Sequence, residues 1–307
     1  MPPPPPLRRA RRRLLLVHAH PDDETITTGG TIARYAAEPD TSVTLVTCTL
    51  GEQGEVMVPE LAGLAADRAD QLGGYRIGEL AAAAAALGLA DRRMLGGTGR
   101  WRDSGMVVVE GVHAAAPPRE QLHARAFCAE EQRAAQVDAL AEIMADVEPH
   151  VVVGYDPSGG YGHPDHVRAH EITMAAADSA PSVRKVYWTV APAADVAAGL
   201  AELAGAAEHG LPWRLATLAE LPSVPDDTVT TRVDVSGQLG AKVAALRAHA
   251  TQLTVWAGPA GSGELAFALT NEIGVPVLRA ESYSLVGASG SVRPVRETDL
   301  FDGIEAW

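Results

Sequence analysis

Short, almost wholly apolar runs recur along the chain, and each is followed by glycine, proline or charged residues. Four of these runs, residues 14–17, 43–47, 151–154 and 185–190, are expected to be strands. Strands that are apolar on both faces are typical of a parallel sheet covered by helices on both sides. The pattern therefore predicts a central sheet that is mostly parallel.

Between these runs, apolar residues recur at the spacing of a helix. Residues 25–37 and 130–147 fit this spacing, and Pro149 ends the second segment. Residues 61–87 are rich in alanine and leucine but are interrupted at "GGY", which predicts two helices there. Later in the chain, residues 228–236 indicate another strand and residues 240–253 another helix. This alternation predicts an α/β fold with a doubly wound sheet.

With 307 residues, 47% of them hydrophobic, the chain can bury a large core. Residues 1–12, rich in proline and arginine, are expected to form a disordered tail. Residues 13–307 are expected to form one catalytic domain, with a core over residues 13–190 and a C-terminal elaboration over residues 191–307.

Charge and cysteine content narrow the expected partners and compartment. The net charge of −14 argues against nucleic acid and membrane surfaces as partners and favours a small molecule. Cys48 and Cys128 lie far apart, which does not indicate a disulfide framework. The N-terminal basic residues lack the apolar core of an export signal, and no later segment has the length of a membrane span. These features predict a cytoplasmic protein.

Polar residues are concentrated directly after the first expected strand, in "HAHPDDE". Ligands of open α/β sheets lie beyond the carboxyl ends of strands. His20 and Asp23, separated by two residues in a turn, can reach one centre, and Asp22 can face it without ligating. The alternative is that Asp22, Asp23 and Glu24 only cap the next helix, but capping does not explain His20. His18 is expected to be a core histidine on the opposite side of the strand.

A second motif, "YDPSGGYGHPDH", follows the apolar run at residues 151–154. His163 and His166 are three residues apart at an expected helix start, so both can face one pocket. Tyr161 is placed to lean over the same pocket. His170, four residues further along, could support the site from the same helix face, but a surface position is favoured.

The two motifs together predict one metal site, in which His20, Asp23 and His166 provide two imidazoles and a carboxylate with open coordination positions. Zinc and iron(II) both suit this set, and an iron(II) oxygenase could use the same ligands. Asp22 then remains free as a base, and His163 as a cationic or hydrogen-bonding group.

These motifs carry a family resemblance. "AHPDDE" with the later "GHPDH" resembles the LmbE/PIG-L family of zinc-dependent N-deacetylases, which implies a Rossmann-like α/β fold. The blocks "TCTLGEQGEV", "DQLGGYRIGEL" and "LGGTGRWRDSGM" resemble the branch of the actinobacterial mycothiol pathway. The resemblance covers most of residues 14–190 and, more weakly, residues 242–252. It implies an amide hydrolase that removes acetate from N-acetylglucosaminyl-inositol.

The resemblance also implies roles for individual residues. It assigns one zinc ion per chain to His20, Asp23 and His166. It implies that Asp22 is the general base for the attack of a zinc-activated water. The residues implied to assist are Tyr161, which polarises the carbonyl, His163, which stabilises the oxyanion, and Asp165, which orients the neighbouring histidine. The positions implied to contact the sugar-inositol are Arg76, Asp103 and Met106.

Other functions remain open on the sequence. A mycothiol S-conjugate amidase, or a deacetylase of another N-acetyl amino sugar, would use the same fold and motifs. A non-enzymatic alternative is a sugar- or nucleotide-binding module. "TTGGT", residues 27–31, does place glycines after a strand, but it lacks the G-x-G-x-x-G spacing of a dinucleotide site.

Overall fold

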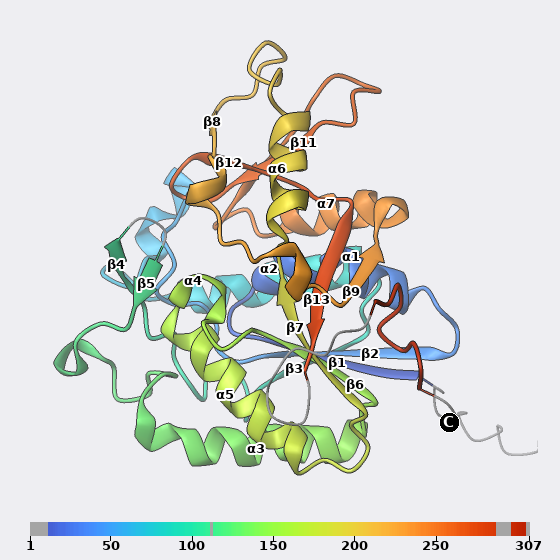
Figure 1. Cartoon of the computed structure of the whole chain (residues 1–307). Coiled ribbons are helices and arrows are strands. Elements are labelled where there is room, and N and C mark those ends of the chain that lie inside the picture. Colours follow the sequence, from blue (N-terminus) through green and yellow to red (C-terminus); the bar gives the residue numbers. More distant parts are fainter. Residues whose placement is uncertain (1–11, 111–112, 287–295, 305–307) are drawn as a thin grey trace, which may run out of the picture.

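The computed structural model describes residues 12–110, 113–286 and 296–304 (Figure 1). The expected N-terminal tail lies outside these residues except for Arg12. Arg12 is the first residue of a strand, so regular structure begins one residue earlier than expected.

A seven-stranded sheet forms the centre of the molecule. Its strands, in spatial order, are β3 (Asp91–Met94), β2 (Thr41–Thr47), β1 (Arg12–His18), β6 (Val151–Gly154), β7 (Lys185–Val190), β13 (Ala280–Leu285) and β9 (Thr231–Asp234). The first five are parallel, and β13 runs antiparallel to both of its neighbours. The expected mostly parallel sheet is confirmed, as are the four strands that the apolar runs predicted and the later strand expected within residues 228–236.

Helices cover both faces of this sheet (Figure 1). The helices of the described chain are α1 (Asp23–Ala36), α2 (Leu72–Ala86), α3 (Arg133–Val147), α4 (Gly159–Gly162), α5 (Pro164–Asp178), α6 (Ala193–Glu202) and α7 (Leu239–Ala248). Leu14 and Leu16 of β1 pack in one cluster with α1, α2 and α7, whereas Leu15 and Val17 pack in another with α3 and α5. Burial of each apolar side chain of this kind contributes roughly 1.5–3 kcal/mol to the free energy of folding. Residues 14–17 of β1 are therefore all apolar, because both faces of this strand are buried.

The rest of the described chain forms smaller units beside the central sheet. A four-stranded sheet combines β10 (Thr254–Ala257), β11 (Leu265–Ala268), β12 (Ile273–Pro276) and β8 (Arg214–Leu215). A hairpin pairs β4 (Val107–Glu110) with β5 (His113–Ala115). The 3₁₀ turns are Pro59–Leu64, Arg119–Gln121, Glu130–Gln132, Leu218–Glu220, Asp226–Thr228 and Ser236–Gln238. No helix among the described residues is long and apolar enough to cross a membrane.

The expected break at "GGY" is wrong, because α2 begins at Leu72 and includes these residues in its first turn. Only a 3₁₀ turn precedes it. Gly73 packs so closely that an added Cβ would lie 2.9 Å from Leu50 Cβ and 2.7 Å from Glu52 Cγ. This glycine therefore permits close packing and does not end a helix.

Strand β13 was not predicted, although it lies inside the central sheet. Its sequence, AESYSL, mixes polar and apolar residues, and all six residues are buried. The polar side chains have partners: Glu281 is 2.6 Å from Lys242 Nζ, and the Tyr283 hydroxyl is 2.6 Å from Thr31 Oγ1. The strand could not be predicted from local hydrophobicity, because the partners of its polar side chains lie far away in the sequence.

Candidate active site

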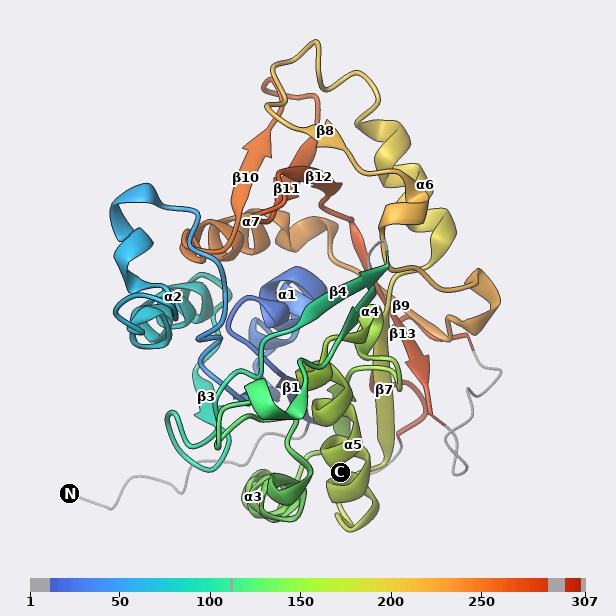
Figure 2. The ribbon, with the colours of Figure 1, turned by 90° about the vertical axis from the view of Figure 1, so that its left-hand side faces the viewer.

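The two polar motifs meet at one edge of the central sheet. β1 and β6 are neighbouring parallel strands, so their carboxyl ends lie at the same edge. The first motif leads from β1 into α1, and the second leads from β6 through α4 into α5. In Figure 2, α4 lies beside the β4–β5 hairpin, close to the start of α5.

Three histidines form the centre of the site. His20, His163 and His166 are all buried, and one ring nitrogen of each lies within 4.8 Å of the others. Their ring centroids are 4.6 Å (His20 to His163), 4.9 Å (His163 to His166) and 5.3 Å (His20 to His166) apart. Three buried imidazoles at these distances are an arrangement suited to a metal ion.

The Asp23 carboxylate joins two of these histidines. Asp23 Oδ2 lies 3.2 Å from His20 Nδ1 and 3.3 Å from His166 Nε2. The same oxygen accepts a 2.9 Å hydrogen bond from the His20 backbone N–H and one of 2.8 Å from the Tyr155 hydroxyl. The structure thus brings together the three residues that the sequence predicted as metal ligands.

His166 shows that this set fits a metal. Its Nδ1 lies 3.1 Å from the Gly159 carbonyl oxygen, so Nδ1 carries the proton and Nε2 presents a lone pair. Nε2 is buried and has no hydrogen-bond partner among the described residues, because the Asp23 oxygen 3.3 Å away is also an acceptor. A histidine fixed at one nitrogen by a carbonyl, with the other nitrogen free, is prepared for metal ligation.

The opposite nitrogen of His20 faces two further acids. His20 Nε2 lies 3.3 Å from Asp165 Oδ2 and 3.5 Å from Asp103 Oδ1, and these residues form a second group that could hold an ion. Burial alone would lower the pKa of His20, but these carboxylates and Asp23 raise it well above its usual value. The Asp165 backbone N–H also donates to His163 Nδ1, at 3.1 Å. Asp165 therefore contacts two histidines, one through its side chain and one through its backbone.

Asp22 is the N-cap residue of α1, but its side chain makes no capping hydrogen bond. Helix capping therefore does not explain this acid. Its backbone φ is 112°, a conformation that side-chain-bearing residues rarely adopt and that is concentrated at functional sites. Burial raises the pKa of Asp22 to about 6, against the opposing effect of Arg76, whose Nη2 lies 3.0 Å from Asp22 Oδ2.

Arg76 is 2% exposed and lies behind Asp22. Its guanidinium donates to the Gly51 carbonyl at 2.8 Å and also to the Pro21 carbonyl. It thereby ties the loop after β1 to the loop after β2.

The other two expected substrate contacts lie on the loop that leads to β4. Asp103 is buried, and its carboxylate accepts hydrogen bonds from the backbone N–H groups of Gly105, at 2.8 Å, and Gln53, at 3.1 Å. Met106 is 46% exposed, directly before the hairpin. Of these two residues, Met106 presents the more accessible side chain.

Tyr161 and His163 complete the group. The Tyr161 ring lies edge-on to the His166 and His163 rings, at 5.2 Å and 6.1 Å between centroids. Burial lowers the pKa of His163 to about 2, which favours the neutral ring. Because His163 Nδ1 accepts from the Asp165 backbone, the neutral ring carries its proton on Nε2 and can donate there.

Sequence reasoning missed Tyr155, whose hydroxyl donates to Asp23 and accepts from the Ala19 backbone N–H at 3.0 Å. Its position directly after β6 was the available signal. His18 is a buried histidine, as expected, with Nε2 3.0 Å from Thr28 Oγ1. The surface position expected for His170 is wrong, because it is half-buried with Nδ1 2.9 Å from the Tyr155 carbonyl.

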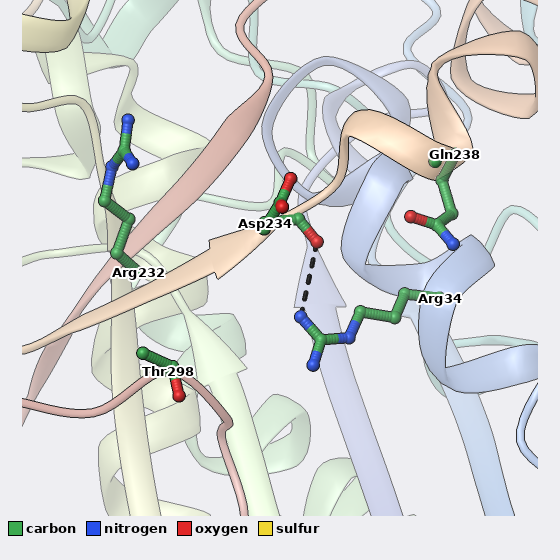
Figure 3. Close-up of a pocket in the computed structure, with 6 residues that line it drawn as sticks. Arg34, Arg232, Asp234, Gln238 and Thr298 are labelled. Carbon is green, nitrogen blue, oxygen red and sulfur yellow. Dashed lines mark hydrogen bonds between the residues drawn. The ribbon is translucent and has the colours of Figure 1, made fainter.

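A separate cavity of about 610 Å³ lies at the other end of α1 (Figure 3). Its lining residues are Arg34, Arg232, Asp234, Gly237, Gln238 and Thr298. Arg34 is eleven residues beyond Asp23 on α1, about 16 Å along the helix axis. None of the histidines or acids described above contributes to this cavity.

Comparison with known proteins gives a consistent result. Residues 15–177 match the protein family described as PIG-L: GlcNAc-PI de-N-acetylase. The chain is 54% identical over 290 residues to 1D-myo-inositol 2-acetamido-2-deoxy-alpha-D-glucopyranoside deacetylase 1 of Saccharopolyspora erythraea, covering 94% of this chain and 93% of that protein. It is 55% identical over 301 residues to the deacetylase of the same name from Nocardia farcinica, covering 94% and 95%.

Among solved structures, N,N'-diacetylchitobiose deacetylase from Pyrococcus horikoshii is similar in fold. Its TM-score is 0.50 at 18% identity, over 78% of this chain and 70% of that one. A deacetylase crystallised in complex with teicoplanin also has a TM-score of 0.50, at 21% identity, over 78% and 87%.

Proposed function

The chain belongs to the PIG-L family of GlcNAc-PI de-N-acetylases, and on this premise we propose that it removes acetate from 1D-myo-inositol 2-acetamido-2-deoxy-α-D-glucopyranoside, a step of mycothiol biosynthesis. The substrate follows from the names of relatives that share about half of its residues over nearly the whole chain. The observation that carries the chemistry is the meeting of His20, Asp23 and His166 at one point. Asp22 directly precedes Asp23, and its carboxylate is held by Arg76.

We infer that His20, through Nδ1, Asp23 and His166, through Nε2, hold one divalent ion, zinc or iron(II). Two imidazoles and one carboxylate suit either metal. The unpartnered His166 Nε2 and the contacts of Asp23 Oδ2 with both histidines support this choice. When bound, such an ion supplies Lewis acidity toward a carbonyl oxygen and a nearby water.

We infer that Asp22 takes the proton from the attacking water and later returns it to the departing amine. Asp22 directly precedes the proposed ligand Asp23, its carboxylate interacts electrostatically with that of Asp23, and Arg76 holds it in place. A positioned general base of this kind contributes a factor of about 10²–10⁴ in rate.

Two neutral donors are proposed to stabilise the negative oxygen that develops on the acetamide. His163 can donate from Nε2, and Tyr161 can donate from its hydroxyl. Loss of one donor of this type typically costs about 10²–10³ in rate. Asp165 is proposed to orient His163, which its backbone N–H contacts, and His20, which its carboxylate contacts.

The roles of Arg76, Asp103 and Met106 in substrate binding remain part of the proposal. The exposed Met106 supports a contact with the sugar. The buried Arg76 would have to exchange a contact with Pro21, Gly51 or Asp22 for one with the inositol.

We also propose the finer features of fold and compartment. The strand order β3–β2–β1–β6–β7, with helices on both faces, supports a Rossmann-like doubly wound sheet whose switch point lies between β1 and β6. Cys48 and Cys128 are both free, which supports a reducing compartment such as the cytoplasm.

The test is acetate release from the proposed substrate by the purified protein, with and without a chelator. The panel includes other N-acetyl amino sugars and a mycothiol S-conjugate. We expect the proposed substrate to have the highest kcat/KM and the chelator to abolish turnover. A higher kcat/KM for the S-conjugate would identify the chain as an amidase instead, and the absence of turnover on all substrates would contradict an enzymatic role.

A further inference from the structure

Glu24, the last acid of the first motif, has no role in the reaction proposed above, yet it is 1% exposed. Its Oε1 lies 2.9 Å from Nε2 of His249, a residue that follows α7 and is fully buried. Burying two ionisable groups costs free energy even when they are paired. A stabilising role alone is therefore a weak explanation for this pair.

The second oxygen of Glu24 contacts the backbone of the proposed base. Glu24 Oε2 accepts a 2.9 Å hydrogen bond from the Asp22 backbone N–H. This N–H belongs to the residue whose φ is 112°. A backbone conformation of this kind is energetically unfavourable and persists only when its surroundings enforce it.

Further contacts fix the Glu24 carboxylate itself. The Thr25 hydroxyl donates to Oε1 at 2.6 Å, and His249 Nε2 meets the same oxygen. On the opposite side of Asp22, Arg76 contacts its carboxylate at 3.0 Å. Asp22 is thus held at its backbone by Glu24 and at its side chain by Arg76.

We propose that Glu24 and His249 are positioning residues, which hold Asp22 in its left-handed backbone conformation so that its carboxylate faces the reacting water. This inference rests on the proposed function, because it assigns the pair to the base of that reaction. It also gives the C-terminal part of the chain a role in the active site, since His249 lies 225 residues after Glu24.

Three variants, Glu24→Ala, Glu24→Gln and His249→Gln, test the proposal in steady-state assays with the zinc content measured for each. Substitution of a residue that orients the groups of a metal site typically lowers activity or metal affinity by about 10–100-fold. We expect Glu24→Ala to lower kcat by about this factor, with KM within about twofold and zinc still near one per chain. Glu24→Gln keeps an oxygen that can accept from the Asp22 N–H, so it should recover most of the lost kcat. His249→Gln should fall between the two.

Glu281→Ala is the matched control. Glu281 is also a buried carboxylate that accepts backbone N–H groups of α1, from Gly30 at 2.9 Å and Thr31 at 2.7 Å, but it does so near the middle of the helix. It also pairs with a buried cation, Lys242, at 2.6 Å. We expect this variant to melt at a lower temperature with kcat within about twofold of wild type. Equal losses of kcat in Glu281→Ala and Glu24→Ala would overturn the proposal, since general loosening of α1 would then explain both.

A crystal structure of Glu24→Ala gives a second readout that does not depend on turnover. We expect Asp22 to relax to a negative φ, and a φ that stays near 112° would overturn the proposal. If Glu24→Ala does not fold, Glu24→Gln and His249→Gln carry the test, and wild-type kcat in His249→Gln would overturn it. An inactive wild-type enzyme would instead refute the proposed function, so the two failures are distinguishable.

Discussion

The residue on which the proposed reaction depends most is Asp22. Its side chain does not cap α1 but pairs with Arg76, whereas Asp23 contacts two histidines, and the backbone of Asp22 is held in an uncommon conformation. Adjacent acids in the sequence therefore have different tasks because the turn between β1 and α1 points their side chains in different directions.

Asp22→Asn keeps the shape of the side chain but removes the base. We expect kcat to fall by about 10²–10⁴, with zinc retained, because the proposed ligands are untouched. The measurement is acetate release beside zinc content by mass spectrometry. A zinc-loaded Asp22→Asn enzyme with near-normal kcat would remove Asp22 from the role of base.

Individual site residues could be predicted from the sequence where residue type and motif spacing determine the chemistry. The positions of His20, Asp23 and His166 after two apolar runs were enough to predict that they meet. The role of Tyr155 could not be predicted, because a tyrosine beside a strand is ordinary until a partner 132 residues away is known. His170 was misplaced for the same reason, since its contact with the Tyr155 carbonyl depends on how α5 packs.

At the scale of elements, the central strands with apolar runs, β1, β2, β6 and β7, were predictable. β9 was also predicted despite its polar residues, whereas β3 and β13 were not. Residues 14–17 of β1 and the whole of β6 lack polar side chains because helices cover both faces of the sheet. β13 is buried with polar side chains that find partners only in the folded protein. Burial of polar strands is decided by long-range hydrogen bonds, which local pattern does not contain.

The first turn of α2 offers a paired test of packing. Gly73→Ala should destabilise the protein by about 1–3 kcal/mol, because the new methyl group would overlap Leu50 and Glu52. Gly74→Ala, at an exposed position with open space around it, should be neutral or stabilise by up to about 1 kcal/mol. Urea denaturation of both variants measures the difference, and equal stabilities would contradict the close packing at Gly73.

The contact between α1 and the loop after α7 predicts a dependence of stability on pH. Burial would lower the pKa of His249, but Glu24 outweighs this and raises it above 6.5. A raised pKa in the folded state stabilises the protein fully below pH 6.5, and this contribution is lost as the pH rises through the folded-state pKa. The stability gap between metal-free wild type and metal-free His249→Gln should therefore be wider at pH 6 than at pH 9. A gap that is constant or grows with pH would contradict the ion pair.

At the scale of the whole molecule, the C-terminal region is continuous with the core. β9 and β13 extend the central sheet beside β7, and His249 approaches the start of α1. We propose on these grounds that the chain from residue 13 onward folds as one domain, with the second sheet as an elaboration. The expected division at residue 190 does not coincide with a boundary in space, because β9 and β13, which follow it in the chain, belong to the central sheet.

Metal binding should be visible in the stability of the whole chain. An ion that binds only the folded state at about 1,000 times its Kd stabilises it by about 4 kcal/mol. We therefore expect a chelator to lower the Tm of the wild type by several degrees, and restored zinc to reverse the change. Asp23→Ala, which lacks one proposed ligand, is the control and should show little response. An equal decrease in Tm in the wild type and in Asp23→Ala would show that the ion binds elsewhere.

The central claim is that loops 18–23 and 155–166 hold one ion between them. Anomalous X-ray scattering at the zinc absorption edge, from crystals of the zinc-loaded protein, locates that ion directly. The account predicts one peak, about 2.0–2.2 Å from His20 Nδ1, an Asp23 oxygen and His166 Nε2. A peak on the Asp103 and Asp165 side of His20, or none between the two loops, would contradict it.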